Sequence, residues 1–94
     1  MANGTAKRRV TFAVSAPEAH EVFLCGTFND WNPTKTPLKP DGRGIWKTQV
    51  PLVPGTYEYR LCIDGEWVND PSADGYVPNP FGTTNSVRAV GTAA

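Results

Sequence analysis

The sequence has little histidine, which limits the enzyme chemistry that it can support. Its 94 residues include one histidine, and His20 lies in a polar turn, where we expect it to be solvated rather than held in a Ser-His-Asp triad. Glycoside hydrolysis needs two carboxylates across a cleft, one of them buried, but the nine acidic residues fall mostly in turns. Because so small a domain builds a thin core without a deep cavity, we predict that the chain is not an enzyme.

Net charge is absent as well. Nine lysine and arginine residues balance nine aspartate and glutamate residues, so the formal net charge is zero. Such a chain has no long-range field that attracts a polyanion or an anionic membrane, and the basic run at residues 7–9 is typical of a solvated strand edge. Glycine-rich phosphate loops are also missing. We therefore predict no nucleic-acid partner, no membrane partner and no cofactor.

Long hydrophobic runs are missing, and cysteine is scarce. The longest apolar run covers residues 22–25, and residues 1–9 contain no hydrophobic segment, so the sequence predicts neither a membrane span nor a signal peptide. We expect a cytoplasmic protein. The two cysteines, Cys25 and Cys62, fall in strand-like segments and not in the loop-rich framework of a disulfide-stapled domain. We expect free thiols, while the separation of the two sulfurs in space does not follow from the sequence.

One acidic stretch has the composition of a calcium site but not its pattern. Residues 64–70, together with Asp74, offer several oxygen ligands. Trp67 and Val68, however, stand where a calcium loop needs small or ligating residues, and no glycine occupies the sixth position. We therefore predict no metal site.

The hydrophobic pattern is that of strands, because apolar and polar residues alternate with a period of two and proline or glycine interrupts nearly every candidate helix. The predicted strands cover residues 9–14, 21–25, 44–50, 56–64, 66–68 and 86–90. The sequence thus predicts an all-β, immunoglobulin-like β-sandwich of about seven short antiparallel strands. We expect this domain to cover residues 8–90, with disordered ends at residues 1–7 and 91–94.

Large apolar and aromatic side chains of these strands form the predicted core. They are Phe12, Val22, Leu24, Trp46, Val50, Tyr57, Tyr59, Leu61 and Ile63. Arg60 alternates with Tyr59 and Leu61, so its side chain points away from the core. An outward arginine on a strand is either solvated, paired with an acid such as Glu58 or Glu66, or available to a ligand.

Two of the three tryptophans fall outside the predicted core. Trp31 lies in a stretch of turn-forming residues, and Trp67 follows the Asp64-Gly65 turn, so both are predicted at loops or edges. An indole face matches the C–H face of a pyranose ring, and Arg, Asn and Thr side chains can bond to sugar hydroxyls. The residues alone support two interpretations equally well. The tryptophans either form a sugar-binding platform or merely cover the ends of the sandwich.

Three motifs occur in one order and together carry a family resemblance. They are residues 24–31 (LCGTFNDW), residues 54–71 (PGTYEYRLCIDGEWVNDP) and residues 81–87 (FGTTNSV). The chain resembles the carbohydrate-binding modules of family 48, which include the glycogen-binding domain of AMP-activated protein kinase beta subunits and domains that precede amylase-type enzymes. The resemblance covers about residues 8–90. It implies an immunoglobulin-like sandwich that binds α-1,4-linked glucans, such as glycogen, starch and maltooligosaccharides, without catalysis.

The resemblance also implies roles for individual positions in the first two motifs. Trp31 and Trp67 correspond to the tryptophans that stack on neighbouring glucose rings. Arg60 stands where the kinase-type domains have a lysine that bonds to sugar hydroxyls. The arginine keeps the charge but presents a planar fork, so the hydrogen-bond pattern is expected to differ.

The third motif supplies the other implied sugar contacts. Phe81 replaces a bulky aliphatic residue that reaches over the sugar ring, and an aromatic side chain there either strengthens stacking or obstructs a curved glucan. Thr83 and Asn85 correspond to loop residues that bond to sugar hydroxyls. The implied binding site thus combines stacking and hydrogen-bonding side chains.

A second function stays open beside glucan binding. Family members next to amylase-type enzymes also act as docking domains, so the alternative prediction is a structural domain that contacts an amylase-type catalytic domain or a kinase subunit and has lost glucan binding. Trp31, Trp67, Thr83 and Asn85 together favour glucan binding, because docking alone does not need sugar-binding side chains.

Overall fold

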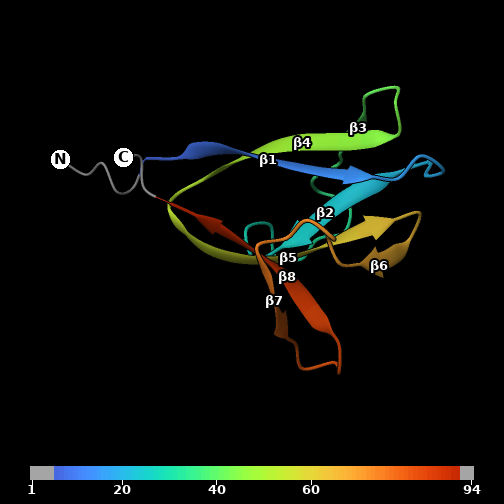
Figure 1. Ribbon diagram of the computed structural model, residues 1–94. Coiled ribbons are helices and arrows are strands. Elements are labelled where there is room, and N and C mark those ends of the chain that lie inside the picture. Colours follow the sequence, from blue (N-terminus) through green and yellow to red (C-terminus); the bar gives the residue numbers. More distant parts are fainter. Residues whose placement is uncertain (1–5, 92–94) are drawn as a thin grey trace.

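The computed structural model describes residues 6–91. It contains eight antiparallel strands, which form two sheets. The strands are β1 (Arg8–Ser15), β2 (Val22–Gly26), β3 (Lys39–Pro40), β4 (Ile45–Leu52), β5 (Gly55–Ile63), β6 (Glu66–Val68), β7 (Gly75–Pro78) and β8 (Thr84–Val90). One sheet has the order β1-β4-β3 and the other the order β2-β5-β8-β7, with β6 paired to β5. The sheets lie as two layers (Figure 1). The predicted all-β, immunoglobulin-like sandwich is confirmed.

Two strands were not among the predicted ones. β3 and β7 are short, and each contains a proline. In a sequence, proline is a signal for a turn and not for a strand. Both lie at the edge of a sheet, where a proline costs no ladder hydrogen bond. Of the predicted disordered ends, residues 1–5 and 92–94 lie outside the described residues.

The core lies between the two layers. Six of the predicted core residues are buried: Phe12, Val22, Leu24, Trp46, Tyr59 and Leu61. Val50, Tyr57 and Ile63 are only partly buried and pack against the core from its margin. The core list missed Val10, Val14, Leu38 and Leu52, which are buried as well. Leu38 gave no strand signal because prolines lie close to it on both sides, but its N–H donates to the backbone oxygen of Val22 at 2.8 Å.

An aromatic pair and one arginine join the two layers. Phe12 of β1 packs edge-on against Tyr59 of β5 with ring centroids 5.0 Å apart, and such a pair contributes about 0.5–1.5 kcal/mol beyond burial. The guanidinium of Arg88 lies 4.7 Å from the centroid of the Phe12 ring. Its Nη2 also donates a hydrogen bond to the backbone oxygen of Thr11 at 2.6 Å. Arg88 therefore connects β8 to the edge strand β1.

Cys25 and Cys62 are free and buried on the neighbouring strands β2 and β5. Burial, with a smaller contribution from the nearby Cys62, raises the pKa of the Cys25 thiol to about 11. A thiol with this pKa carries almost no thiolate at neutral pH. Cys25 is therefore a packing residue and not a nucleophile.

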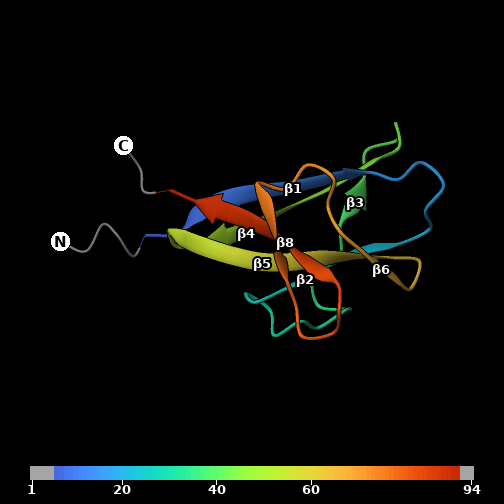
Figure 2. The ribbon, with the colours of Figure 1, turned by 60° about the horizontal axis from the view of Figure 1, so that its bottom comes forward.

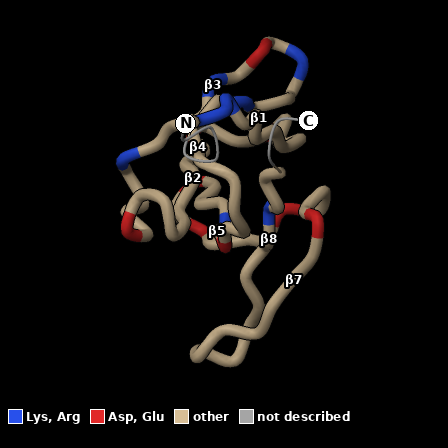
Figure 3. Tube along the Cα trace, turned by 90° about the vertical axis from the view of Figure 1, so that its left-hand side faces the viewer, with Lys and Arg blue, Asp and Glu red and all other residues tan. Residues whose placement is uncertain are grey.

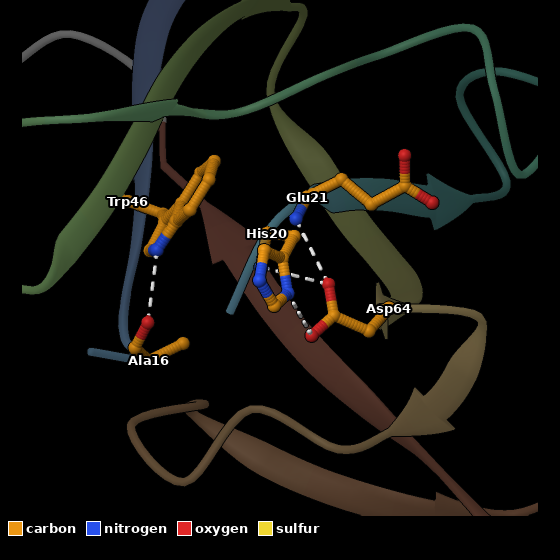
Figure 4. Close-up of polar contacts among 5 residues, drawn as sticks. All are labelled: Ala16, His20, Glu21, Trp46 and Asp64. Carbon is orange, nitrogen blue, oxygen red and sulfur yellow. Dashed lines mark hydrogen bonds and ion pairs between the residues drawn. The ribbon is translucent and has the colours of Figure 1, made fainter. Parts of the chain in front are cut away.

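The connection from β1 to β2 is fixed by side chains from elsewhere in the chain (Figure 4). Oδ1 of Asp64 accepts hydrogen bonds from the backbone N–H groups of His20 and Glu21, at 2.8 and 2.9 Å. The indole Nε1 of Trp46 donates to the backbone oxygen of Ala16 at 3.0 Å. The side chain of His20 is 93% exposed, as predicted for a solvated turn. Asp64 thus has a structural role, and its two backbone hydrogen bonds lower its pKa.

These bonds predict an acid-dependent contribution to stability. Because the pKa of Asp64 is lowered from its ordinary value of 3.8, the carboxylate stabilises the fold above that pH, and the contribution is lost as the pH falls through the folded-state pKa. We expect Asp64→Asn to lower the free energy of unfolding at neutral pH, and the difference from the parent to shrink at pH values well below 3.8. Urea unfolding at several pH values measures this difference.

Glu18→Gln is the matched control for this prediction. It removes one negative charge from the exposed β1–β2 connection to which Asp64 is bonded, but the Glu18 side chain makes no hydrogen bond among residues 6–91. We expect Glu18→Gln to keep the pH profile of the parent. A destabilisation by Asp64→Asn that stays constant across the acid range would contradict the prediction.

Candidate functional site

A groove with a volume of about 730 Å³ lies over the outer face of the five-stranded sheet. The loop after β2 and the β7–β8 hairpin project on the same side of β5 (Figure 2). Residues of both segments line the groove and form its walls. Its lining residues are Thr27, Trp31, Glu58, Arg60, Trp67, Asn79, Pro80, Phe81, Thr83 and Asn85. The structure therefore brings all six site residues predicted from the sequence to one place.

The groove differs from what the size of the chain predicted. We expected no cleft, because a small core cannot enclose a cavity. The walls of this groove, however, are formed by loop residues, and Glu58 and Arg60 of β5 form its floor. Loops of this kind need no additional core, so a small sandwich can carry an open groove.

Trp31 belongs to a loop with unusual backbone geometry. Asp30 and Trp31 both have left-handed φ angles, 57° and 59°, and each such non-glycine residue costs about 1 kcal/mol or more. The buried Asn29 offsets this cost. Its Oδ1 accepts from the N–H of Gly26 at 3.0 Å, and its Nδ2 donates to the backbone oxygen of Leu24 at 2.8 Å. Asn29 Nδ2 also donates to a threonine hydroxyl of the same loop at 2.9 Å, so the loop that presents Trp31 is clamped.

Gly26 is needed at the start of this loop for a steric reason. A Cβ at this position would lie 2.7 Å from the backbone oxygen of Glu58 and 2.8 Å from the ring of Phe28. The close approach lets the N–H of Thr27 donate to that same oxygen at 3.0 Å. Phe28 in turn packs against Phe12, with ring centroids 5.8 Å apart. The motif of residues 24–31 therefore anchors the loop to β5 and to the core.

Trp67 is placed by a tight turn and a short edge strand. Asp64 and Gly65 have φ angles of 50° and 86°, which are the left-handed values of a type I′ hairpin turn. The return strand β6 pairs Trp67 with Cys62 of β5, and Trp67 stays 39% exposed. Trp67 therefore presents its indole at the edge of the groove.

Arg60 is held beside Trp67 and forms no ion pair within residues 6–91. Its Nη2 donates to the backbone oxygen of Trp67 at 3.3 Å, and its buried Nε has no hydrogen-bond partner within the described residues. In the same part of the chain, no carboxylate of Glu58 or Glu66 comes within 4.0 Å of the guanidinium. Of the alternatives open for an outward arginine, pairing with an acid is therefore excluded in residues 6–91.

The loop between β7 and β8 is organised by Asn79. Its Oδ1 accepts hydrogen bonds from the N–H groups of Phe81 and Thr83, at 3.0 and 3.1 Å. Its Nδ2 donates to the Thr83 hydroxyl at 2.7 Å and to Oδ1 of Asn85 at 3.0 Å. This clamp leaves the Phe81 side chain 86% exposed at the tip, so its ring is free to contact a ligand.

Asn85 is the most buried of the six predicted site residues. The residue is 8% exposed, and its amide lies between Asn79, from which it accepts, and Glu58, to which Nδ2 donates at 3.1 Å. One N–H of the amide is left for a ligand. Glu58 and Asn79 were missed by the sequence reasoning. Glu58 could have been found, since it shares the outer face of β5 with Arg60 two positions later.

A polar cluster around the buried Asp70 fixes the hairpin to the sheet. Oδ2 of Asp70 accepts from the Tyr59 hydroxyl at 2.6 Å, and the N–H of Asp70 donates to Oγ of Ser86 at 2.9 Å. The Tyr76 hydroxyl donates to the backbone oxygen of Asp70, also at 2.6 Å. Burial, followed by the hydrogen bond to Asp70, raises the pKa of Tyr59. Asp70 thus ties β5, β7 and β8 together, and the hairpin keeps its position over the sheet.

Charge is scarce around the groove. Glu58 and Arg60 are the two charged residues among the ten described lining residues. The β7–β8 hairpin carries no charged residue between positions 75 and 87 (Figure 3). Nor do three or more His, Cys, Asp or Glu side chains gather as metal ligands anywhere in the described ranges of the chain. The groove can therefore offer apolar stacking and hydrogen bonds to an uncharged ligand.

Comparison with known proteins gives one matching family. The profile of carbohydrate-binding module 48 (isoamylase N-terminal domain) matches residues 2–81, so Thr83 and Asn85 lie beyond the matched stretch. The chain is 37% identical over 67 residues to mouse 5'-AMP-activated protein kinase subunit beta-2, which is 71% of this chain and 24% of that protein.

Two further relatives come from a plant and a bacterium. The chain is 35% identical over 63 residues to Protein FLOURY ENDOSPERM 6, chloroplastic, of Oryza sativa subsp. japonica, covering 67% of this chain and 12% of that protein. It is 47% identical over 53 residues to the 1,4-alpha-glucan branching enzyme GlgB of Bacillus caldolyticus, covering 53% of this chain and 8% of the enzyme. The chain thus spans a quarter or less of the relatives it matches.

The clamp at Asn29 gives a prediction about stability. Asn29→Ala leaves the buried N–H of Gly26 and the backbone oxygen of Leu24 without their partners, and each loss of this kind costs about 1–3 kcal/mol. We expect urea unfolding to show a loss of about 2–4 kcal/mol in the free energy of unfolding. Asn32→Ala is the control, because Asn32 is an exposed residue of the same loop, and among the described residues its Oδ1 accepts only from Thr34. Equal destabilisation by both variants would contradict the clamp.

Proposed function

The chain belongs to the family of carbohydrate-binding module 48, and from this premise we propose that its groove binds α-1,4-linked glucans such as glycogen and starch chains. The domain contributes binding and no catalysis. The observation that carries the proposal is that Trp31, Arg60, Trp67, Phe81, Thr83 and Asn85, taken from three separate motifs, line one groove.

The side chains of the groove match the chemistry of a glucan. The indoles of Trp31 and Trp67 supply flat apolar faces for the C–H faces of glucose rings, and the exposed ring of Phe81 supplies a third. Between them, the hydroxyl of Thr83 and the guanidinium of Arg60 can donate to sugar oxygens. Two to three stacked rings and a few exposed hydrogen bonds correspond to dissociation constants from about tens of micromolar to millimolar.

A docking role is the alternative that this proposal competes with. The relatives named above include a kinase subunit and a branching enzyme, and each is far longer than this chain. A kinase subunit or an amylase-type enzyme is therefore the partner that the alternative would require. The groove has no net charge and is lined by two indoles. These features favour glucan binding, because a protein interface of this size needs no such set of hydroxyl-binding groups.

The cellular location stays a prediction. The described residues contain no helix long and apolar enough to cross a membrane. One relative, the rice protein, is chloroplastic by its name.

Calorimetry with β-cyclodextrin and with maltoheptaose tests the proposed function. We expect the parent to bind both, and Trp31→Ala and Trp67→Ala each to weaken binding about tenfold or more, since each removes one stacked ring. Lys47→Ala is the control, because Lys47 is exposed on β4 of the opposite sheet. Cellopentaose, with β-1,4 linkages, is the control ligand. If millimolar glucan produced neither heat nor a change in tryptophan fluorescence, the proposed function would be ruled out.

A further inference from the structure

The groove contains two opposite charges that do not neutralise each other by contact. Glu58 and Arg60 lie two positions apart on the same face of β5, which places their Cα atoms about 7 Å apart along the strand. No N···O pair of 4.0 Å or less joins them in the described structure. Both groups therefore keep hydrogen-bonding capacity toward the groove, while their fields cancel at a distance.

The carboxylate of Glu58 is fixed in place and still has an open oxygen. Its Oε1 accepts from Nδ2 of Asn85 at 3.1 Å, and Asn85 is itself held by Asn79 at 3.0 Å. The backbone oxygen of Glu58 accepts from the N–H of Thr27 at 3.0 Å. No partner of Oε2 occurs among the described residues, and this oxygen is not among the buried unpaired atoms. It is therefore accessible from the groove.

We infer that Glu58 is a ligand-binding residue that accepts hydrogen bonds from glucan hydroxyls and makes the groove selective against anionic sugars. The inference rests on the proposed glucan binding. It assigns a residue that lies outside the set derived from the three motifs. Asn79 and Asn85 act as positioning residues in this arrangement, because their hydrogen bonds orient the carboxylate.

The chemistry of the two ligand classes explains the selectivity. A carboxylate is an acceptor only, and a sugar hydroxyl donates to it in a charge-assisted hydrogen bond. A phosphate on the sugar offers negative charge in place of such a donor. Without Glu58, the guanidinium of Arg60 would attract that charge. With Glu58 within one Debye length, which is about 8 Å at physiological ionic strength, the net charge of the groove is zero and the attraction is lost.

The test compares Glu58→Gln with Glu66→Gln on two ligands. The amide introduced by Glu58→Gln keeps an oxygen that can accept from Asn85 but has no charge. Glu66 is exposed on β6 beside Trp67 and does not line the groove, so Glu66→Gln removes the same net charge elsewhere. The ligands are maltoheptaose and a maltodextrin that carries glucose 6-phosphate units, measured by calorimetry at low ionic strength. Circular dichroism and urea unfolding check that each variant is folded.

We expect Glu58→Gln to weaken maltoheptaose binding about three- to tenfold, because a charge-assisted hydrogen bond becomes a neutral one. For the phosphorylated maltodextrin we expect no loss or a gain, so that the preference for the neutral ligand falls about threefold or more. Glu66→Gln should change both affinities less than about twofold, as a surface charge outside the contact does.

The outcomes separate this inference from the proposed function. If the parent binds maltoheptaose and Glu58→Gln binds both ligands as the parent does, the role of Glu58 is overturned while glucan binding stands. If Glu66→Gln shifts the preference as much as Glu58→Gln, the effect is one of overall charge and the inference is overturned as well. If the parent binds neither ligand, both the proposed function and the inference fail.

Discussion

The alternation along β5 is the constraint on which both the core and the groove depend. Tyr59 and Leu61 are buried between the layers, whereas Glu58 and Arg60 line the groove on the other face. A slip of one residue would exchange the two sets and place charges in the core. The register is held from both sides, because β2 and β8 pair with β5. It is also held by the Tyr59 hydroxyl, whose hydrogen bond at 2.6 Å satisfies the buried carboxylate of Asp70.

Three polar side chains convert this sheet into a site with fixed walls. Asn29 clamps the loop of Trp31, Asn79 clamps the tip that carries Phe81, and Asp70 ties the hairpin to the sheet. Loops normally lose conformational entropy when a ligand orders them, and that loss reduces affinity. Here the ordering is already done by hydrogen bonds in the free chain. A small module without a large contact area depends on such preorganisation more than an enzyme with an enclosed pocket does.

The sequence predicted the features that depend on local patterns. Alternation gave the long strands and the outward direction of Arg60, and turn residues placed both Trp31 and Trp67 outside the core. The short edge strands β3 and β7 were not predicted, because each contains a proline, and a proline in a sequence usually indicates a turn. The burial of Leu38 was not predicted, because Leu38 is held by a backbone hydrogen bond to β2, which lies far from it in the sequence. Long-range contacts of this kind leave no local periodicity.

The candidate site shows the same division between local and distant information. Family motifs pointed to the six residues that share the groove, but they did not reveal that Asn85 is 8% exposed and shared between Asn79 and Glu58. That geometry depends on how β5 and β8 pair and on where the hairpin tip folds back. Sequence spacing could therefore identify the participants of the site and not the hydrogen bonds among them.

The balance of positive and negative charges has a different physical consequence in the groove than in the whole chain. Across the chain, nine positive and nine negative residues give a net charge of zero, which only removes long-range steering. In the groove, one cation and one anion on the same face cancel at a distance but remain separate donors and acceptors at contact. A neutral polymer of repeating hydroxyls gains from this arrangement, since it meets both hydrogen-bonding types without desolvating a net charge. The weak glucan binding that we propose suits a polymer, because many identical sugar units raise the local concentration of ligand and extend the time that a weakly bound module stays near the chain.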